Sequence, residues 1–255
     1  MRIVFIGSGN VATQLSMALK SAGHSISQVY SRTASHASEL AGKLECPYTT
    51  CPDHILTDAD VYIISVKDDA IGNIVSTICT GRTQSIFLHT AGSIPMDVFR
   101  SHASRYGVFY PMQTFSKNRQ VDFTNIPVFI EASDAVTLEQ IRSIAASISH
   151  NVVEADSDKR KKLHLAAVLA CNLANHCYRL AERVLEEEHI DFNLFLPLIE
   201  ETARKVTYMS PREAQTGPMV RYDTGVMDMQ IRLIPDERTR QIYRLMAESI
   251  HEDSK

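Results

Sequence analysis

The amino-acid sequence predicts an α/β protein in which a doubly wound parallel sheet is followed by a mostly helical C-terminal part. Short runs rich in β-branched and aromatic residues alternate with helical stretches as far as about residue 156. The runs are continuously apolar, which is typical of parallel strands covered by helices on both faces. A glycine-containing turn joins the first run to the first helical stretch. Beyond residue 156 only helical patterns remain, as expected for a second, helical part of the chain.

The elements of the sheet region follow from these patterns in order along the chain. Turn residues separate the runs, and the helical stretches carry apolar residues at three- and four-residue spacing. We expect strands near residues 2–7, 25–31, 60–66, 84–90, 106–110, 126–132 and 151–155. We expect the helices between them to span residues 10–22, 34–44, 69–79 and 135–149.

The residues after 156 predict a second domain built from helices. Residues 156–189 could form one helix of about thirty residues, roughly 45 Å long. Further helices are expected near 192–206 and 236–251, with prolines as breaks. The domains are therefore expected at 1–156 and 157–255. Residues 163–174 are apolar nearly all round the helix, which predicts burial, and a two-fold homodimer through the C-terminal helices would provide it.

Composition narrows the possible functions. A net charge of −4 over 255 residues argues against a protein that binds nucleic acid or a membrane surface. No apolar run approaches the roughly 20 residues of a membrane span. The N-terminus turns glycine-rich too early for a signal peptide, so we expect a cytoplasmic protein.

Metal-binding spacings are absent from the sequence. The five cysteines form no CxxC pair, and the ten histidines form neither HxxxH nor HExxH. Structural zinc sites and helix-borne catalytic metal sites rely on such spacings. We therefore expect no metal site.

The first turn carries the clearest functional signal. The sequence GSGNVA (residues 7–12) lies between the first expected strand and the first expected helix. Gly7 suits a tight turn, Gly9 lets the backbone approach a pyrophosphate, and Ala12 permits close helix–strand packing. Free amides at the helix start attract the anion. The expected cofactor contacts here are Gly7, Ser8, Gly9, Asn10 and Val11, the alternative being a plain turn.

The end of the second expected strand indicates which dinucleotide binds. An NAD site usually has an acid there, which accepts a hydrogen bond from the ribose 2′-hydroxyl. This chain has Ser31, Arg32 and Thr33 instead, and the next acid is Glu39. A guanidinium and two hydroxyls would bind a 2′-phosphate with charge-assisted hydrogen bonds. The sequence therefore predicts NADP, unless Arg32 is a solvated surface residue.

These motifs give the chain a family resemblance. The features IGSGNVA, YSRT and ISVKDD resemble the NADP-binding domain of pyrroline-5-carboxylate reductase and deazaflavin-dependent NADP reductase. The whole chain resembles a group of NADP-dependent oxidoreductases that pair a Rossmann-like domain with a helical domain of unassigned function. The supporting stretches are HTAGSIP, GVFYPMQTF, LHLAAVLACNLANH and EAQTGPMVRYD. The resemblance implies NADP, a dimer built through the helical domain, and redox chemistry on a small molecule.

Three positions depart from that group. Tyr110 stands where the group has a histidine before proline, and Tyr222 stands where it has a glycine. Gln230 lies near a position that often carries a histidine. The departures remove two candidate proton donors, so they bear on catalysis more than on binding.

The remaining candidate residues follow the ends of the central strands, where doubly wound sheets bind ligands. Val66 and Lys67 are expected beside the adenosine ribose and pyrophosphate. Thr90, Ala91 and Gly92 are expected near the nicotinamide, where small residues leave space for a substrate. Ser93 and Gln113 are candidate substrate contacts. His89 ends an apolar strand and could be either catalytic or a satisfied core residue.

The long helix carries polar residues on an otherwise apolar segment. His164, Asn172, Asn175 and Arg179 fall within a sector of about 80° at 100° per residue. Buried polar groups need partners, which indicates a polar cleft or a polar seam between subunits. By analogy with reductases of related fold, His164 would donate a proton and Asn172 would orient the substrate. The alternative is that these side chains tie helices together.

Residues 215–223 are expected to form a loop because of Gly217-Pro218. Thr216 and Arg221 could close over the cleft, with Arg221 holding a substrate carboxylate.

The sequence thus favours an NADP(H)-dependent oxidoreductase that acts on a small carbonyl or imine compound. One alternative is a non-catalytic NADP-binding or sensing protein with a degenerate active site. A dehydrogenase-like fold that uses another nucleotide is a third hypothesis, against which Arg32 argues.

Overall fold

A computed structural model describes all 255 residues of the chain. The chain divides into two compact units, Met1–Cys171 and Asn172–Lys255. The first unit contains an eight-stranded sheet, and the second is helical.

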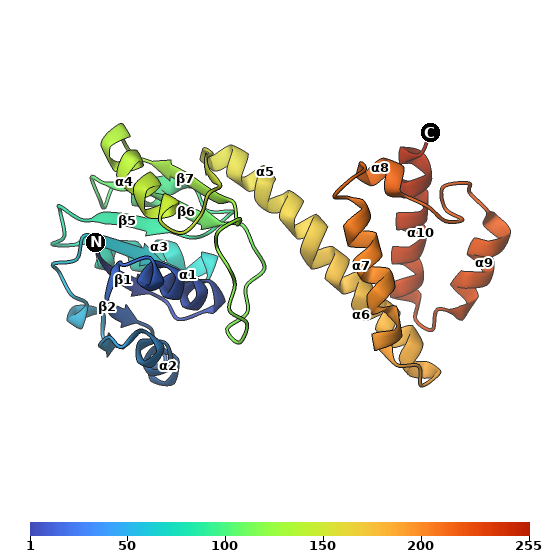
Figure 1. Ribbon diagram of the computed structural model, residues 1–255, viewed down its shortest axis with the longest axis horizontal. Coiled ribbons are helices and arrows are strands. Elements are labelled where there is room, and N and C mark those ends of the chain that lie inside the picture. Colours follow the sequence, from blue (N-terminus) through green and yellow to red (C-terminus); the bar gives the residue numbers. More distant parts are fainter. The chain divides into compact units, whose positions relative to one another are not determined.

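The sheet confirms the predicted α/β doubly wound class. Its strand order is β3-β2-β1-β4-β5-β6-β7-β8, with β4 and β5 in the middle (Figure 1). The strands are β1 (Arg2–Ile6), β2 (Ser25–Tyr30), β3 (Tyr48–Thr49), β4 (Val61–Ile64), β5 (Ile86–His89), β6 (Tyr106–Pro111), β7 (Val128–Ala132) and β8 (Val152–Glu154). All seven predicted strands are present. The two-residue β3 was missed, because so short a strand leaves no pattern in the sequence.

One pairing departs from the expected parallel sheet. Strands β6 and β7 are antiparallel, whereas every other neighbouring pair is parallel. A parallel connection needs a crossover of a dozen or more residues, usually helical. Residues 112–127, which join β6 to β7, contain no helix.

Helices cover both faces of the sheet. Helices α1 (Asn10–Ser21), α2 (Ala34–Leu44) and α4 (Ala135–Ala146) pack on one face. Helix α3 (Asp68–Cys79) covers the other face, with the short helices η1 (Pro52–His54) and η2 (Met96–Phe99). All four α-helices of this region were predicted within a few residues.

Strand β1 shows why the runs are continuously apolar. Ile3 and Phe5 belong to the core under α1, α2 and α4, whereas Val4 and Ile6 belong to the core under α3. All four side chains are fully buried. Successive strand residues point to opposite faces, so a sheet covered on both sides needs an apolar residue at every position. Each such side chain contributes about 1.5–3 kcal/mol through burial.

The predicted thirty-residue helix consists of three consecutive helical elements. They are α5 (Ser157–Ala167), the π-helical η3 (Val168–Leu173) and α6 (Ala174–Glu187). The remaining helices are η4 (Phe192–Phe195), α7 (Leu196–Lys205), α8 (Pro211–Ala214), α9 (Thr224–Leu233) and α10 (Glu237–Asp253). None of them has the length and apolar character needed to cross a bilayer.

The boundary between the compact units falls later than residue 156. Strand β8 ends at Glu154, but α5 still belongs to the sheet unit. Its Arg160 is fully buried and forms an ion pair with Glu131 on β7. The first part of the long helix is therefore packed as part of the sheet unit.

The single chain leaves part of the segment 163–174 exposed, so its predicted burial, which depends on a second subunit, stays a prediction. Leu165, Leu169 and Leu173 are 60%, 56% and 51% exposed. Side chains four residues apart share one helix face, so the three leucines form an apolar stripe in contact with solvent.

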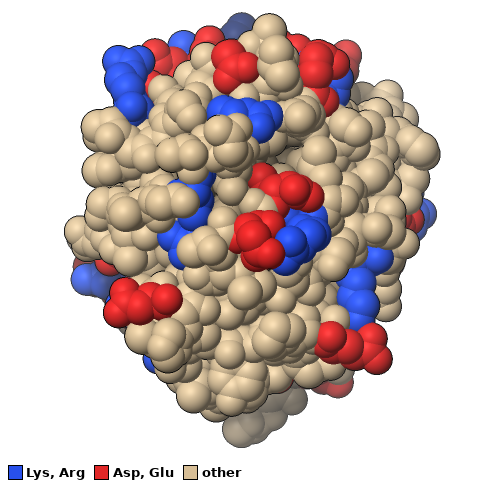
Figure 2. Space-filling model, turned by 90° about the vertical axis from the view of Figure 1, so that its left-hand side faces the viewer, with Lys and Arg blue, Asp and Glu red and all other residues tan.

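Charged side chains are dispersed over the surface. Figure 2 shows one face of the molecule, on which basic and acidic residues lie interspersed on a largely uncharged surface. Exposed ion pairs of the structure include Arg2–Asp58 and Lys20–Glu45, with side chains 37% to 83% exposed.

Candidate active site

A cavity of about 860 Å³ lies at the carboxyl ends of β1, β2, β4, β5 and β6. It lies entirely within the sheet unit. All twelve residues predicted to bind the cofactor line it: Gly7, Ser8, Gly9, Asn10, Val11, Ser31, Arg32, Thr33, Val66, Lys67, Thr90 and Ala91. Gln113 and His164 line the same cavity.

Gly7 makes the turn after β1 possible. Its φ is +117°, in the region that favours glycine. A Cβ on Gly7 would lie 2.2 Å from the carbonyl oxygen of Ser65, and the Gly7 amide donates a 2.7 Å hydrogen bond to Tyr30. The backbones that follow β1, β2 and β4 are therefore in close contact at this point.

Gly9 leaves open space instead. A Cβ on Gly9 would meet no atom within 4 Å. Helix α1 starts at the next residue, with no side-chain cap and no acid in its first turn. Free backbone amides, the positive end of the helix dipole and the open space beside Gly9 together suit the pyrophosphate of a dinucleotide.

The end of β2 presents a hydroxyl and a guanidinium to the cavity. Ser8 donates a 2.9 Å hydrogen bond to Ser31 Oγ, which ties the ends of β1 and β2 together. Arg32 is exposed and takes part in none of the ion pairs of the structure. Its guanidinium is therefore available to an anionic ligand.

At the other end of the cavity, Tyr110 and His164 form a hydrogen bond. Tyr110 Oη and His164 Nδ1 lie 2.9 Å apart, and the tautomer of the histidine decides which group donates. The two rings meet edge to face at 78°. Burial raises the pKa of Tyr110, which keeps the phenol protonated at neutral pH.

His164 also fills the space beside Gly92. A Cβ on Gly92 would lie 2.6 Å from His164 Cγ. The imidazole occupies the space directly beside Gly92, while Thr90, Ala91 and Gly92 all line the cavity, so the space expected there for a substrate stays a prediction. Gly92 allows α5 to bring His164 to the end of β5.

Buried ionic contacts fix α5 in this position. Arg160, one turn before His164, forms an ion pair with Glu131 and donates a 2.6 Å hydrogen bond to the Ile94 carbonyl. Ser157 hydrogen-bonds to the same Glu131 carboxylate, and Asp156 caps the helix by accepting from the Lys159 amide at 2.8 Å. A buried ion pair specifies position well, since breaking it costs about 3–5 kcal/mol.

His89 lies in the core and does not line the cavity. It is completely buried and stacks on Phe99. Its Nδ1 accepts a 3.2 Å hydrogen bond from the Ala91 amide, which shapes the turn after β5. Burial and the nearby Arg160 guanidinium lower its pKa to about 3, so the ring is neutral. These contacts favour the core interpretation over a catalytic role.

Several candidates lie elsewhere. Ser93 hydrogen-bonds to the Asp68 carboxylate and does not line the cavity, whereas Asp68 does. The other candidates belong to the second unit, and their roles remain predictions: Asn172, Asn175, Arg179, Thr216 and Arg221.

Within the second unit, some polar residues have local partners. Arg179 lies 2.7 Å from both Glu182 and Glu186. Asp223 accepts from the Val226 amide and caps α9. Residues 215–223 contain no strand and no α-helix, as predicted. Tyr222 adopts a φ of +54° and packs against His251.

Several residues that line the cavity were not among the candidates from the sequence, including His36, Asn73 and Lys117. Asp68 lines the cavity directly after Lys67, in the segment after β4 where the strand-end rule places ligands. Lys117 lies in a long connection without a motif, and only the fold brings it to the cavity. The structure contains no group of three or more His, Cys, Asp or Glu residues suited to a metal ion.

Comparisons with known proteins agree with this geometry. Residues 2–88 match the family model described as NADP oxidoreductase coenzyme F420-dependent. Residues 126–250 match the model Domain of unknown function (DUF2520). A crystal structure from Bacteroides fragilis, assigned as an NADP oxidoreductase, is 48% identical over 98% of both chains, with a TM-score of 0.96. The chain belongs to this family of NADP oxidoreductases.

More distant structures share the fold of this oxidoreductase. A protein from Thermotoga maritima is 21% identical over 99% of both chains, with a TM-score of 0.81. An imine reductase from Myxococcus stipitatus, in complex with NADP⁺, is 15% identical with a TM-score of 0.69. That match covers 99% of this chain and 92% of the imine reductase. A comparison with curated proteins finds no match.

Proposed function

We propose that this oxidoreductase uses NADPH to reduce a small imine or carbonyl compound. The observation that carries the proposal is the Tyr110–His164 hydrogen bond, in the same cavity as the glycine turn after β1. One end of the cavity suits a dinucleotide phosphate, and the other carries a proton donor. Reduction of a C=N or C=O bond requires both functions in one site.

The residues of the chain supply the proton and the orientation. When bound, NADPH would be the source of a hydride for the substrate carbon. His164 donates a proton from Nε2 to the substrate nitrogen or oxygen, so that one hydride and one proton are added across the double bond. Tyr110 holds the imidazole through Nδ1. Gly92 lets the ring approach the end of β5.

The preference for NADPH rests on the end of β2. Arg32 is exposed and has no acidic partner, and Ser31 and Thr33 add hydroxyl groups on either side. These groups suit a 2′-phosphate, whereas an NAD site would need an acid in their place. Binding of NADP⁺ by the structurally similar imine reductase supports the same choice.

An imine or carbonyl substrate agrees with the polar groups at the nicotinamide end of the cavity. His164 and Tyr110 face it as hydrogen-bond donors or acceptors, and Gln113 lines it beside them. The similarity of fold to imine reductases supports C=N compounds as the first substrates to test.

The competing hypothesis is a non-catalytic protein that binds or senses NADP. Incubation with NADPH and a panel of cyclic imines, keto acids and amine–ketone pairs distinguishes the two. Substrate-dependent loss of absorbance at 340 nm is expected for the reductase. Tight NADPH binding without oxidation by any compound of these classes would favour the sensor, and preferential binding of a different nucleotide would overturn both.

We also propose that the protein forms a homodimer through its C-terminal helices. The exposed stripe Leu165, Leu169 and Leu173 supports this arrangement, as do exposed Leu245 and Met246 on α10. Apolar stripes of this kind on a monomer are unfavourable in water, and a second copy covers them most simply.

A further inference from the structure

We propose that residues 112–127 select NADPH by bringing Lys117 to the 2′-phosphate. This segment, called the strap below, joins β6 to β7 without a helix. The proposal rests on the proposed use of NADPH. It assigns a role in cofactor selection to a segment far in sequence from the nucleotide-binding motifs.

Lys117 reaches the side of the cavity formed by α2. It lines the cavity together with Arg32 and His36. Its Nζ lies 3.5 Å from Glu39 Oε2, on the second turn of α2. Its side chain is only 26% exposed, so the amine lies against the protein. The strap thus adds a second cation to the region of Arg32.

Glu39 explains why a second cation matters. It is the first acid after β2, and an acid in this region would repel a 2′-phosphate. Its two oxygens are engaged by Lys43 at 3.1 Å and by Lys117 at 3.5 Å. The two lysines lower its pKa, so the carboxylate stays ionised. With two lysines against one carboxylate, this group of three side chains carries a net positive charge, and Lys117 shares the cavity with Arg32.

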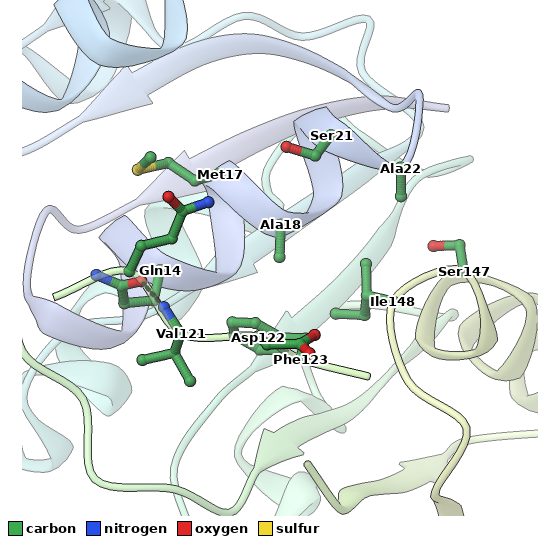
Figure 3. A pocket seen from close by; sticks show the side chains of 11 residues that line it. Gln14, Met17, Ala18, Ser21, Ala22, Val121, Asp122, Phe123, Ser147 and Ile148 are labelled. Atoms are coloured by element: carbon green, nitrogen blue, oxygen red, sulfur yellow. Dashed lines mark hydrogen bonds between the residues drawn. The ribbon is translucent and has the colours of Figure 1, made fainter. Parts of the chain in front are cut away.

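Gln14 holds the strap in this position. It lies on α1, is 3% exposed, and uses both ends of its amide. Its Nε2 donates to the Ser116 carbonyl at 2.7 Å, and its Oε1 accepts from the Val121 amide at 3.3 Å. Figure 3 shows Gln14 on α1 directed toward the strap beside Val121. Ser116 immediately precedes Lys117, so the hydrogen bond fixes the backbone next to the lysine.

Aromatic packing stabilises the same loop. Phe115 stacks on Phe123, with ring centroids 5.5 Å apart and an interplanar angle of 17°. Phe123 and Ile126 are buried in the core under α1. A loop ordered before the ligand arrives loses less entropy on binding, which raises affinity.

The test compares two charge-removing substitutions on the strap. Lys117→Gln removes the cation that lines the cavity, and Arg119→Gln removes an exposed cation two residues away that does not line it. Dissociation constants for NADPH and NADH are measured through the fluorescence of the cofactor, because the chain has no tryptophan.

We expect Lys117→Gln to weaken NADPH binding about 5- to 20-fold, as for one charge-assisted contact at a partly exposed site. NADH binding should change less than about two-fold. Arg119→Gln should leave both dissociation constants unchanged within the same factor. Lys117→Arg should keep the preference for NADPH, and Gln14→Leu should reduce it by releasing the strap.

Three outcomes decide between the proposals. If the wild-type protein shows no preference for NADPH over NADH, the proposed cofactor itself is wrong. If that preference exists and depends on Arg32, but Lys117→Gln behaves like Arg119→Gln, only the role of the strap is overturned. Equal losses for both cofactors in Lys117→Gln, with an unchanged unfolding temperature, would likewise reject selection by the 2′-phosphate.

Discussion

Tyr110 Oη and His164 Nδ1 lie 2.9 Å apart, although 54 residues separate them in the chain. Tyr110 stands near the carboxyl end of β6, and His164 stands in the second turn of α5. The tyrosine that replaces the histidine of the resembling oxidoreductases therefore has a histidine as its hydrogen-bond partner. The proton-donating function implied by that resemblance can be supplied by the pair.

His164→Ala should lower the turnover of an identified substrate by about 10²- to 10⁴-fold, the usual contribution of a general acid. NADPH affinity should stay within a few-fold, because the imidazole acts on the substrate. Tyr110→Phe should cause a smaller loss by releasing the ring. His102→Ala, an exposed histidine on the same unit, is the control. If turnover survives in His164→Ala, the proton comes from another group.

The two glycines of the first turn should respond differently to alanine. Gly7→Ala places a Cβ against the Ser65 carbonyl at a positive φ, so a loss of about 1–3 kcal/mol in unfolding free energy is expected. Gly9→Ala meets no protein atom and should leave the unfolding temperature nearly unchanged. It should nevertheless weaken NADPH binding by at least about ten-fold, since the methyl group enters the expected pyrophosphate site. Calorimetry measures the change in stability, and cofactor fluorescence measures the change in affinity. An unchanged NADPH affinity in Gly9→Ala would show that the pyrophosphate does not bind beside Gly9.

Arg32→Ala tests the choice of cofactor. A charge-assisted hydrogen bond contributes about 1.5–3 kcal/mol, which corresponds to roughly 10- to 150-fold in affinity. NADPH binding should weaken by that order, while NADH binding stays nearly constant. Titrations that follow the fluorescence of each cofactor give both values. Similar losses of affinity for both cofactors would mean that Arg32 does not contact the 2′-phosphate.

His89 should make the stability of the protein depend on pH. Its pKa is about 3 in the folded protein and about 6.5 in the unfolded chain. The stabilisation is therefore complete above pH 6.5 and is lost as the pH falls from 6.5 toward 3. The unfolding free energy should decrease by up to about 1.4 kcal/mol per pH unit in that window.

Urea denaturation of the wild type and of His89→Asn between pH 7.5 and 4.5 checks this expectation. Asparagine can still accept a hydrogen bond from the Ala91 amide but does not titrate. The variant should be less stable at pH 7.5 and should show a flatter pH dependence. His102→Asn should follow the wild type. If the unfolding free energies of the wild type and His89→Asn change with pH in the same way, His89 is not the cause of the pH dependence.

The dimer proposal predicts a mass of about 57 kDa in light scattering, twice the 28.5 kDa of one chain. Leu169→Glu places a charge in the centre of the exposed stripe and should give the monomer. Val136→Glu, at an apolar residue on α4 that is 69% exposed against 56% for Leu169, should not affect assembly. A wild-type chain that remains monomeric at micromolar concentration would contradict the proposal.

The strands and sheet helices could be predicted because burial on two faces leaves a continuous apolar run in the sequence. The direction of β7 could not be read from its run, since a buried strand has the same composition in either direction. The only available signal was the connection 112–127, which lacks a helical pattern.

The gathering of the predicted cofactor-binding residues in one cavity followed from the sequence, because these residues directly follow strands and share one edge of the sheet. The sequence also predicted that His164 would lie within reach of residues 90–93, by analogy with related reductases, and its ring lies against Gly92. Tyr110 was interpreted as the loss of a proton donor, since its partner on α5 cannot be identified from a local motif. Lys117 was missed for the same reason.

The antiparallel pairing of β6 and β7 has a geometric consequence for catalysis. Because β7 and β8 run antiparallel to β6, β8 ends at the edge of the sheet opposite the cavity. The chain after β8 can therefore run back along the sheet toward the cavity. Helix α5 starts where the Ser157 amide donates to Glu131, a residue opposite Val108 in the middle of β6. The seven residues from Ser157 to His164 rise roughly 10 Å, about the rise of three strand residues from Val108 to Pro111. With β7 and β8 parallel to β6, the helix would begin at the level of the cavity and lead away from it, so the change of strand direction supplies the path by which a helical side chain reaches the substrate.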